Sequence, residues 1–254
     1  MHSPRVVQAE NPGPFTLDGT CTYLVGEHEV AVVDPGPELE SHHRALLDAL
    51  QGARRVHVLV THHHPDHSGG ARALARELGV PFTGPGPEAD LQLAEGDRWQ
   101  TDAGELVALE TPGHSRDHVA FEWREARSIF VGDLILGSGE TTWVGEYAGC
   151  VADYLASLER LRARRPTVLF PGHGPPIEDA EARITLFREH RLARIRKVES
   201  LLAEDFEAEA EDLLPAVYGD EVPAGLTAAA VESIAAILHY LRGGTPNEGE
   251  GARS

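Results

Sequence analysis

The chain contains 254 residues, a length that fits one large domain or one domain with a small appendage. Hydrophobic residues make up 41% and charged residues 25% of the chain, which excludes a collagen-like, a disulfide-scaffold and a fully disordered protein. With 22 basic and 41 acidic residues, the formal net charge of −19 disfavours non-specific binding to nucleic acid or anionic membranes, so a polyanionic substrate would need a local basic patch.

The first two-thirds of the chain alternates short β-rich runs with helical patterns. Thr22–Val25 and Val30–Val33 predict a β-hairpin that ends at Asp34-Pro35-Gly36. Further strands are expected at Val56–Val60, Leu106–Leu109, Val119–Trp123, Ser128–Val131 and Val168–Phe170. Helices are expected at Leu39–Leu50, Gly70–Leu78 and Val151–Arg164, and Gly79 stands at the C-terminal end of the second. We assign residues 1–177 to this strand-containing domain.

Beyond Ile177 the sequence is helical and highly charged, with few strand signals. Helices are expected at Leu186–Leu202, Leu213–Tyr218 and Ala228–Leu241. We therefore place a small helical appendage at residues 178–242. The remaining residues, 243–254, are rich in Gly, Pro and Glu and predict a disordered tail.

The sequence contains no signal for export or membrane insertion. Met1–Gly13 carries no apolar run of signal-peptide length, and no stretch approaches the roughly 18 apolar residues of a membrane span. Cys21 and Cys150 are too few for a disulfide framework and fit no cysteine metal site. We expect both cysteines to be reduced and buried, with a single disulfide as the alternative. These features predict a cytoplasmic protein.

The most informative feature is the placement of the 14 histidines. Thr61-His62-His63-His64-Pro65-Asp66-His67 directly follows a predicted buried strand. Side chains two residues apart in extended backbone point the same way, so His62 and His64 can reach one metal ion together, while His63 points elsewhere. Asp66 and His67 lie where the chain turns into a helix and can reach a second position nearby. Imidazole and carboxylate suit zinc and similar divalent ions.

Three later sites follow one pattern, in which a ligand-type residue stands just past a strand in a glycine-flanked turn. They are Thr111-Pro112-Gly113-His114, Val131-Gly132-Asp133 and Pro171-Gly172-His173-Gly174. One such loop histidine would be a weak signal, but three of these sites in order behind the histidine cluster form a strong one. The sequence therefore predicts a metal centre assembled from four segments.

The order and spacing of these residues resembles the metallo-β-lactamase superfamily. Asp34 matches the superfamily's first motif, an Asp after an early strand that supports the site from behind the metal ligands. The match covers about residues 15–177. It implies an α+β fold, an αββα sandwich in which two packed sheets are flanked by helices and the site lies at one edge.

The resemblance also implies a role for each residue. One metal ion would be held by His62, His64 and His114, the other by Asp66, His67 and His173, and Asp133 would bridge the two. Such ions lie about 3.5–4 Å apart and share a hydroxide that attacks an ester carbonyl or a phosphorus. Asp66 and Asp133 are therefore the expected catalytic carboxylates. The expected cofactor is a pair of divalent ions, most simply Zn²⁺, with Mn²⁺ or Fe²⁺ as alternatives.

Several branches of the superfamily fit less well. Zinc β-lactamases commonly use a Cys ligand where this chain has Asp133, and neither cysteine here lies in a ligand motif. Flavodiiron proteins replace the second His of the cluster by Glu, whereas this chain has His64. Persulfide dioxygenases use one iron on two His and one Asp, whereas this chain has a complete second ligand set with His173.

Three finer features resemble the β-lactamase-like protein 2 group. They are His118, four residues past His114; the segment Gly139–Gly145 with Trp143 ahead of Asp153–Leu158; and a helical end with Val217-Tyr218-Gly219 and His239-Tyr240-Leu241. Characterised members of that group are endoribonucleases of single-stranded RNA with a small winged-helix-like C-terminal domain. The leading hypothesis is thus phosphodiester hydrolysis by a metal-bridging hydroxide, with single-stranded RNA as a candidate substrate.

Two interpretations stay open for several residues. The basic stretch Arg183–Lys197 could bind RNA phosphates, or it could be a solvated helix whose arginines pair with nearby glutamates. His118 is either a residue that supports the ligands or contacts substrate, or an ordinary loop histidine. Trp143 is either a site-flanking ring that stacks a base, or a packing residue.

Two alternative functions compete with the phosphodiesterase hypothesis. A glyoxalase II-type thioesterase would share all seven ligands and act on a small-molecule ester, but its glutathione-binding residues do not map onto residues 178–242. A non-catalytic, metal-stabilised interaction protein belongs to a different class. The intact ligand set argues against it, because a structural site needs no open position. No membrane partner is expected, and the oligomeric state is left open.

Overall fold

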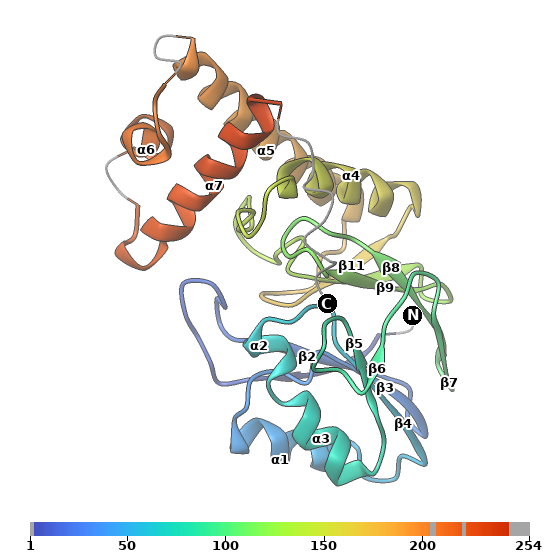
Figure 1. Cartoon of the computed structure of the whole chain (residues 1–254). Helices are drawn as coiled ribbons and strands as arrows, with labels where there is room; N and C mark the ends of the chain where they lie inside the picture. The colour runs from blue at the N-terminus through green and yellow to red at the C-terminus, as the bar shows by residue number, and fades with distance from the viewer. Residues whose placement is uncertain (1–2, 204–206, 220–221, 244–254) are drawn as a thin grey trace, which may run out of the picture.

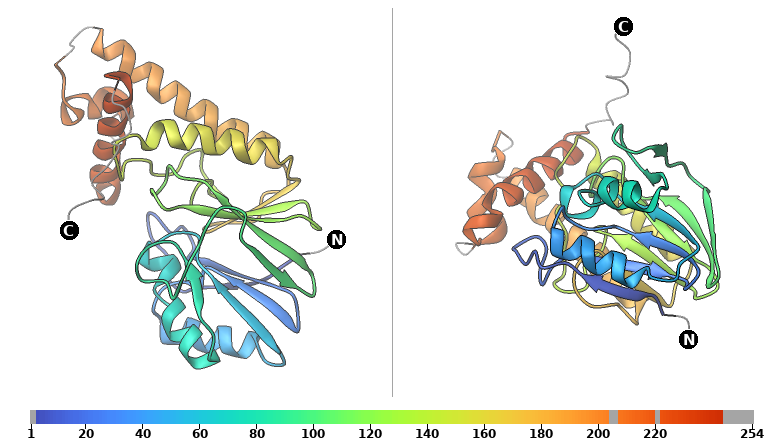
Figure 2. Two further views of the ribbon diagram at one scale, coloured as in Figure 1. Left: turned by 45° about the vertical axis from the view of Figure 1, so that its right-hand side comes forward. Right: turned by 90° about the horizontal axis from the view of Figure 1, so that it is seen from below.

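The computed structural model describes residues 3–203, 207–219 and 222–243, and it contains two β-sheets packed face to face between layers of helices (Figure 1). The first sheet has the strand order β1-β2-β3-β4-β5-β6 and the second β11-β10-β9-β8-β7. Helices α1 and α3 lie against the first sheet, and α4 and α5 cover the second, side by side (Figure 2). The predicted α+β sandwich is confirmed.

The bounds of the elements are as follows. The first sheet contains β1 (Arg5–Gln8), β2 (Cys21–Val25), β3 (Glu29–Val33), β4 (Arg55–Leu59), β5 (Phe82–Gly84) and β6 (Leu91–Gln92). The second contains β7 (Arg98–Thr101), β8 (Gly104–Glu110), β9 (Val119–Trp123), β10 (Ser128–Gly132) and β11 (Val168–Pro171). The helices are α1 (Glu40–Ala49), α2 (Pro65–Ser68), α3 (Ala71–Leu78), α4 (Cys150–Ala163), α5 (Ala180–Leu202), α6 (Ala210–Tyr218) and α7 (Thr227–Leu241), with a 3₁₀ turn at Ala224–Leu226.

Strand direction explains why the metal-ligand motifs meet. In the first sheet β3 and β4 are parallel, so Asp34 and the histidine cluster both follow carboxyl ends at one edge. In the second sheet β9 is antiparallel to both β8 and β10, and β10 is parallel to β11, so β8, β10 and β11 run the same way. Because the carboxyl ends of parallel strands meet at one edge, the loops with His114, Asp133 and His173 lie together.

Three apolar clusters hold the layers together. One fills the space between the sheets with aromatic rings such as Phe121 and Phe130, and a second lies between the first sheet and helices α1 and α3. The third runs without a break from the second sheet through Leu158 of α4 to Val198 of α5 and Ile237 of α7. The C-terminal helices therefore share a core with the sandwich.

Several elements differ from expectation. Helix α5 begins at Ala180 rather than Leu186, because the Asp179 side chain caps it by accepting a hydrogen bond from the Ala182 amide. The short strands β1, β5, β6 and β7 and helix α2 were not anticipated. They are two to four residues long, too short for a periodic pattern to mark them.

The C-terminal segment is helical, as predicted. Among its described residues there are helices and no strand, so the β-wing of a winged-helix domain is not seen there. Residues 244–254 of the predicted disordered tail lie outside the described residues. Within the described residues, every helix is too short or too polar to cross a bilayer. Both cysteines are free and buried, as expected.

Candidate metal centre

The first three ligand-type histidines converge on one point. The nitrogen atoms His62 Nε2 and His64 Nδ1 are 3.0 Å apart, and His114 Nε2 is 3.0 Å from the same His64 Nδ1. His62 and His64 lie in the loop that follows β4, which bends at residues 61–63, while His114 follows β8. His62 and His114 are buried, and His64 is partly exposed. The predicted first ligand set is therefore assembled in space.

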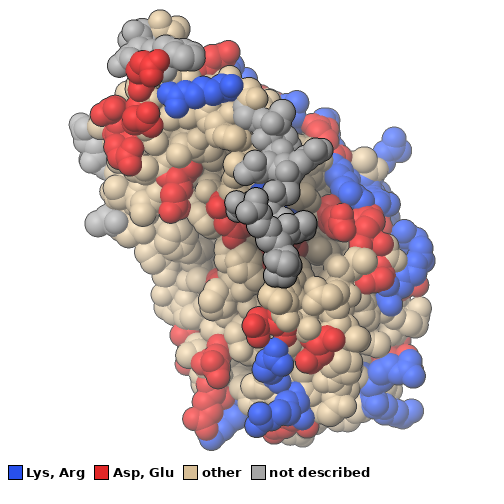
Figure 3. Space-filling view, in the orientation of Figure 1, with Lys and Arg blue, Asp and Glu red and all other residues tan. Residues whose placement is uncertain are grey.

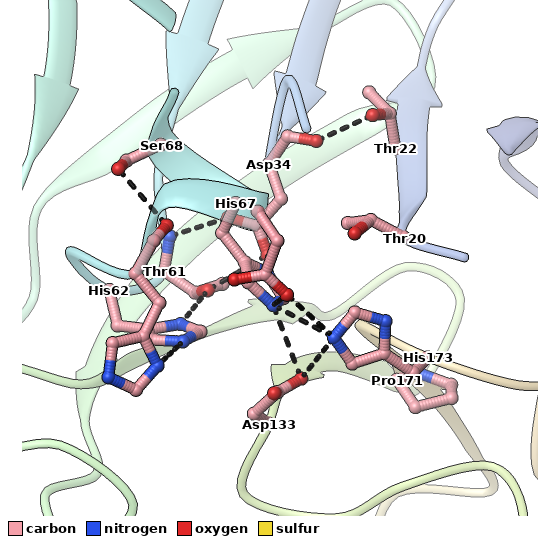
Figure 4. Close-up of polar contacts among 12 residues, drawn as sticks. Thr20, Thr22, Asp34, Thr61, His62, His67, Ser68, Asp133, Pro171 and His173 are labelled. Atoms are coloured by element: carbon pink, nitrogen blue, oxygen red, sulfur yellow. Dashed lines mark hydrogen bonds and ion pairs between the residues drawn. The ribbon is translucent and has the colours of Figure 1, made fainter. Parts of the chain in front are cut away.

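The second set consists of Asp66, His67 and His173 together with Asp133. Figure 4 shows His67, His173 and Asp133 pointing toward one another, with His62 of the first set near them. Pro65 starts the short helix α2, whose first turn carries Asp66 and His67 toward the loop after β11. The atoms His67 Nε2 and His173 Nε2 are 3.2 Å apart, and Asp66 Oδ2 lies 3.1 Å from His173 Nε2. His67 and His173 are completely buried, whereas the Asp66 carboxylate is partly exposed.

Asp133 lies between the two sets. Its Oδ1 is 3.3 Å from His67 Nε2 and 3.4 Å from His173 Nε2, and its Oδ2 is 3.8 Å from His114 Nε2. One carboxylate oxygen thus faces each ligand set, which is the geometry that a bridging carboxylate needs. The structure brings together all seven predicted ligand residues at one edge of the sandwich.

Four of the imidazoles are oriented by hydrogen bonds of the ring nitrogen that faces away from the cluster. His114 Nδ1 and His173 Nδ1 face the backbone oxygens of Trp143 and Gly19, and His67 Nδ1 faces the Asp34 carboxylate at 2.9 Å. All three partners are acceptors only, so each Nδ1 carries a proton. Thr61 Oγ1 donates to Asp34 Oδ2 and therefore accepts from His62 Nδ1 in the same way. The Nε2 atoms of His62 and His114, whose rings burial keeps neutral, then present lone pairs toward His64 Nδ1.

Such a cluster fits divalent metal ions. Facing lone pairs repel unless a cation lies between them, and Asp133 Oδ1 is a buried oxygen without a hydrogen-bond partner among the described residues. Imidazole and carboxylate are the donors that zinc and similar ions take, and the outer hydrogen bonds are the kind that orient metal-ligating histidines. The chemistry of the donor set therefore agrees with a two-metal site.

The two sets differ in their proton affinity. Burial lowers the pKa of His62 well below its usual range and that of His114 to about 4, so both rings are neutral at neutral pH. Burial also acts on His67 and His173, but the charges of Asp133 and its neighbours outweigh it and raise the pKa of His173 to about 9 and that of His67 well above normal. A cation entering the second set must displace these protons.

Two glycines permit this close approach. A Cβ atom on Gly172 would lie 2.5 Å from His67 Cε1 and 2.6 Å from Asp133 Oδ1. Gly132 has a positive φ of 47°, and a Cβ there would lie 2.6 Å from His118 Nε2. These contacts explain why a glycine precedes both Asp133 and His173.

Sequence reasoning missed the partners of His63 and His64. His63 Nε2 lies 3.2 Å and His64 Nε2 3.5 Å from Glu146 Oε1, and His63 Nδ1 lies 3.0 Å from Asp117. Glu146 therefore sits behind His64 on the side away from the other ligands. No local pattern marks it, because it lies in an irregular loop between β10 and α4.

The structure also places His118 and Trp143. His118 is buried behind His62, with ring centroids 5.2 Å apart, and its Nδ1 lies 2.9 Å from Thr111 Oγ1. It supports the ligands from behind and is not among the described residues that line the pocket above the metal centre. Trp143 is half-buried and flanks the site, 6.0 Å from the ring of His64 between centroids.

A pocket of about 740 Å³ opens directly onto the metal centre. Its floor includes His64, Asp66, His114 and Asp133. Its walls come from both ends of the chain and are mostly apolar: Pro14, Phe15, Leu136, Trp143, Val222, Pro223, Leu226 and Ala228–Ala230. The C-terminal segment thus supplies one side of the candidate active site.

The basic helix does not form an open phosphate-binding surface. On α5, Arg183 donates to the Leu136 carbonyl, Arg194 donates to the Val217 carbonyl, and Arg188 pairs with Glu159 and Glu189. Arg191 is buried and donates to the Thr142 carbonyl. On the face shown in Figure 3, Lys and Arg lie interspersed with Asp and Glu rather than in one basic patch. The expected pairing with glutamates is seen for Arg188, whereas Arg183, Arg191 and Arg194 donate to backbone carbonyls instead, and Arg196 and Lys197 are exposed.

Comparison with known proteins agrees with this geometry. The model of the metallo-beta-lactamase superfamily matches residues 15–104 and 102–173, and the chain belongs to that superfamily. Members of this superfamily bind divalent metal ions, and the chain is a metal-dependent hydrolase of the family.

Two curated relatives span most of the chain. It is 30% identical over 249 residues to a beta-lactamase-like protein 2 homolog of Caenorhabditis elegans, an alignment that covers 92% of this chain and 82% of the relative. It is 33% identical over 246 residues to an atrochrysone carboxyl ACP thioesterase of Aspergillus chevalieri, covering 91% and 78% of the two chains.

Solved structures resemble almost the whole chain, including its C-terminal helices. A metallo-beta-lactamase family protein from Thermus thermophilus superposes with a TM-score of 0.79 at 25% identity, covering 94% of this chain and 93% of that one. A beta-lactamase domain protein from Burkholderia ambifaria gives the same TM-score at 26% identity, covering 95% and 87%. The sandwich with its helical extension is therefore a shared architecture.

Proposed function

We propose that this protein hydrolyses a carboxylic thioester or ester whose acyl group is largely apolar. The observation that carries the proposal is the pocket, in which apolar walls lead directly onto the candidate metal ligands. Apolar walls with a few convergent polar groups are typical of small-molecule sites and favour burial of hydrocarbon. An acyl chain against Leu136 and Leu226 would point its carbonyl carbon toward Asp133.

The candidate ligand residues would hold two metal ions. His62, His64 and His114 would hold one divalent ion, Asp66, His67 and His173 the other, and Asp133 would touch both. When bound, the two ions supply an activated water and stabilise the oxyanion of the attacked carbonyl. Asp34 holds His67 in place through the contact between its carboxylate and His67 Nδ1.

Charge and arginine placement weigh against the phosphodiesterase alternative. A single-stranded RNA approaching a chain of net charge −19 needs free cations near the site. Four of the five arginines of α5 donate to backbone carbonyls or pair with glutamates, and one Arg and no Lys are among the described residues that line the pocket. The relative named as an acyl carrier protein thioesterase adds support for acyl-group chemistry.

The test is a substrate panel with zinc-loaded protein. We expect hydrolysis of medium-chain acyl thioesters of N-acetylcysteamine, with kcat/KM at least about tenfold above that for S-lactoylglutathione, bis-p-nitrophenyl phosphate, nitrocefin or single-stranded RNA. Asp133→Asn protein serves as the inactive control for contaminating esterases. Cleavage of RNA or of the phosphodiester without thioester hydrolysis would replace this proposal by the phosphodiesterase hypothesis.

A further inference from the structure

Arg191 is an unusual arginine in the wall of the pocket. It lies in the middle of α5, its side chain is 3% exposed, and it is the single Arg or Lys among the described residues that line the pocket. A buried guanidinium is costly unless a counter-charge accompanies it. The positive charge of Arg191 therefore requires a negatively charged or hydrogen-bonding partner.

The protein itself balances Arg191 only in part. Its Nη2 donates to the Thr142 carbonyl at 2.9 Å, and its Cζ lies 5.4 Å from the centre of the Tyr154 ring. Within the described part of the chain, its buried Nε has no hydrogen-bond partner, and no Asp or Glu forms an ion pair with it. A guanidinium has five N–H donors, so the residues that the structure describes use only a part of its hydrogen-bonding capacity.

The other arginines of α5 show that this is not a property of the helix. Arg188, almost one turn earlier, pairs with Glu159 and Glu189 at the surface. Arg194, almost one turn later, donates to the Val217 carbonyl and lies 4.0 Å from the centre of the Tyr218 ring. Arg191 alone combines burial, a place in the pocket wall and an unused donor.

The position of Arg191 connects it to the metal centre. The Thr142 carbonyl accepts from Arg191, and the next residue, Trp143, accepts from His114 Nδ1 through its own carbonyl. The arginine and a candidate metal ligand therefore bind adjacent peptide groups of one loop. Glu232, which also lines the pocket, is exposed, so solvent screens its charge.

We propose that Arg191 recognises an oxyanion carried by the substrate, so that the natural substrate is a thioester or ester with an apolar body and one anionic group. This inference rests on the proposed function. Arg191 would bind the anion through paired N–H donors in a dry environment, where such contacts are strong. The anion is either a carboxylate at the far end of the acyl chain or a phosphate on the leaving group.

Two matched substrate pairs distinguish these sources. The first compares N-acetylcysteamine thioesters of C4–C8 dicarboxylic half-acids with their neutral carboxamide counterparts. The second compares hexanoyl-phosphopantetheine with hexanoyl-pantetheine. We expect the parent enzyme to prefer the anionic member of one pair by about tenfold or more in kcat/KM, mainly through KM. Equal rates within both pairs would overturn the proposal, whatever any variant does.

Variants then assign the preference to Arg191. Arg191→Gln should erase it, Arg191→Lys should keep part of it because the charge remains, and the matched control Arg188→Gln should retain it in full. If Arg191→Gln slows the anionic and neutral substrates equally, Arg191 is a clamp on the Thr142 loop and not a binding residue. That outcome contradicts the proposal.

A second measurement tests the anion site even if the protein does not hydrolyse thioesters. Inhibition of whichever hydrolysis the enzyme performs is measured with adipamic acid and with neutral adipamide. Any binding of the carboxylate to the metal ions is common to the parent and the variants, so the change between parent and Arg191→Gln isolates the arginine. We expect the inhibition constant of adipamic acid to rise by about tenfold in Arg191→Gln but not in Arg188→Gln. An unchanged constant would contradict the anion site independently of the reaction.

Discussion

The two halves of the candidate metal centre differ in how they are prepared for a cation. The half formed by His62, His64 and His114 contains only imidazoles, and burial keeps His62 and His114 neutral. The half formed by Asp66, His67 and His173 contains a carboxylate and shares Asp133, and its histidines retain protons. The first half can coordinate a metal ion without losing protons, whereas the second half must release protons when a metal ion binds. Asp133 joins these two environments.

The largest expected effect comes from removing the negative charge of Asp133, which faces both ligand sets. Asp133→Asn keeps the shape of the side chain but removes the charge that both sets face at 3.3–3.8 Å. We expect turnover to fall by about a thousandfold or more, and bound metal to fall below two ions per chain, with the fold retained. Activity assays, elemental analysis and circular dichroism measure the three outcomes.

Asp90→Asn is the matched control, since Asp90 is an exposed residue near Arg72 and far in sequence from the ligand motifs. It should leave both activity and metal content unchanged. Near-normal activity of Asp133→Asn with full metal content would remove Asp133 from the bridging role.

The next effect separates the two halves by metal content. We expect the parent protein to bind two divalent ions, and His173→Gln to bind close to one, because its Nε2 is 3.1–3.4 Å from the ligand atoms of Asp66, His67 and Asp133. His190→Gln is a suitable control, because His190 lies on α5 away from these ligands. Elemental analysis after dialysis measures the ratio. A parent value of one would indicate a mononuclear site.

A smaller effect follows from the protons of the second half. The pKa of His173 is raised to about 9 and that of His67 lies well above normal, so at pH 7 both are protonated without metal. Metal binding releases these protons, and its apparent affinity must fall as pH falls. The first half, with the pKa of His114 at about 4, should lose affinity only at much lower pH.

Titration calorimetry at pH 6–8, in buffers of different ionisation enthalpy, measures this difference. We expect two classes of ion, of which the weaker releases at least one proton and weakens by up to about tenfold per released proton for each pH unit. Two ions with the same dependence on pH would contradict the electrostatic distinction between the halves.

The sequence predicted the metal centre better than the pocket, for a physical reason. His62–His67, His114, Asp133 and His173 follow strands that the apolar pattern marks, and parallel carboxyl ends must meet at one edge. The pocket wall instead combines Phe15, Leu136 and Leu226, which are brought together only by packing of the C-terminal helices. Arg191 illustrates the same limit. In the sequence it is one of several helix arginines, and only packing shows that it is buried.

The smallest predicted effect concerns Glu146. Its contact with His64 differs from the contacts that orient His62 and His114 in the same half. His62 and His114 direct their outer nitrogens to fixed partners, Thr61 Oγ1 at 2.9 Å and the Trp143 carbonyl at 3.0 Å. His64 is the partly exposed ligand of this set, and its outer nitrogen faces Glu146 at 3.5 Å. This longer contact with a partly exposed carboxylate should stabilise the ring only weakly.

Glu146→Gln keeps a hydrogen-bond acceptor but removes the charge behind His64. We expect kcat to fall by about two- to tenfold and the affinity of the first half for metal to fall similarly, with the second half unaffected. Asp117→Asn is the matched control, because Asp117 contacts His63, which is not among the predicted ligands. If both variants lower kcat and metal affinity equally, the loss comes from the negative charge around His63 and not from the orientation of His64. If only Glu146→Gln weakens the first half, the carboxylate orients His64, and each imidazole of that set depends on its own outer partner.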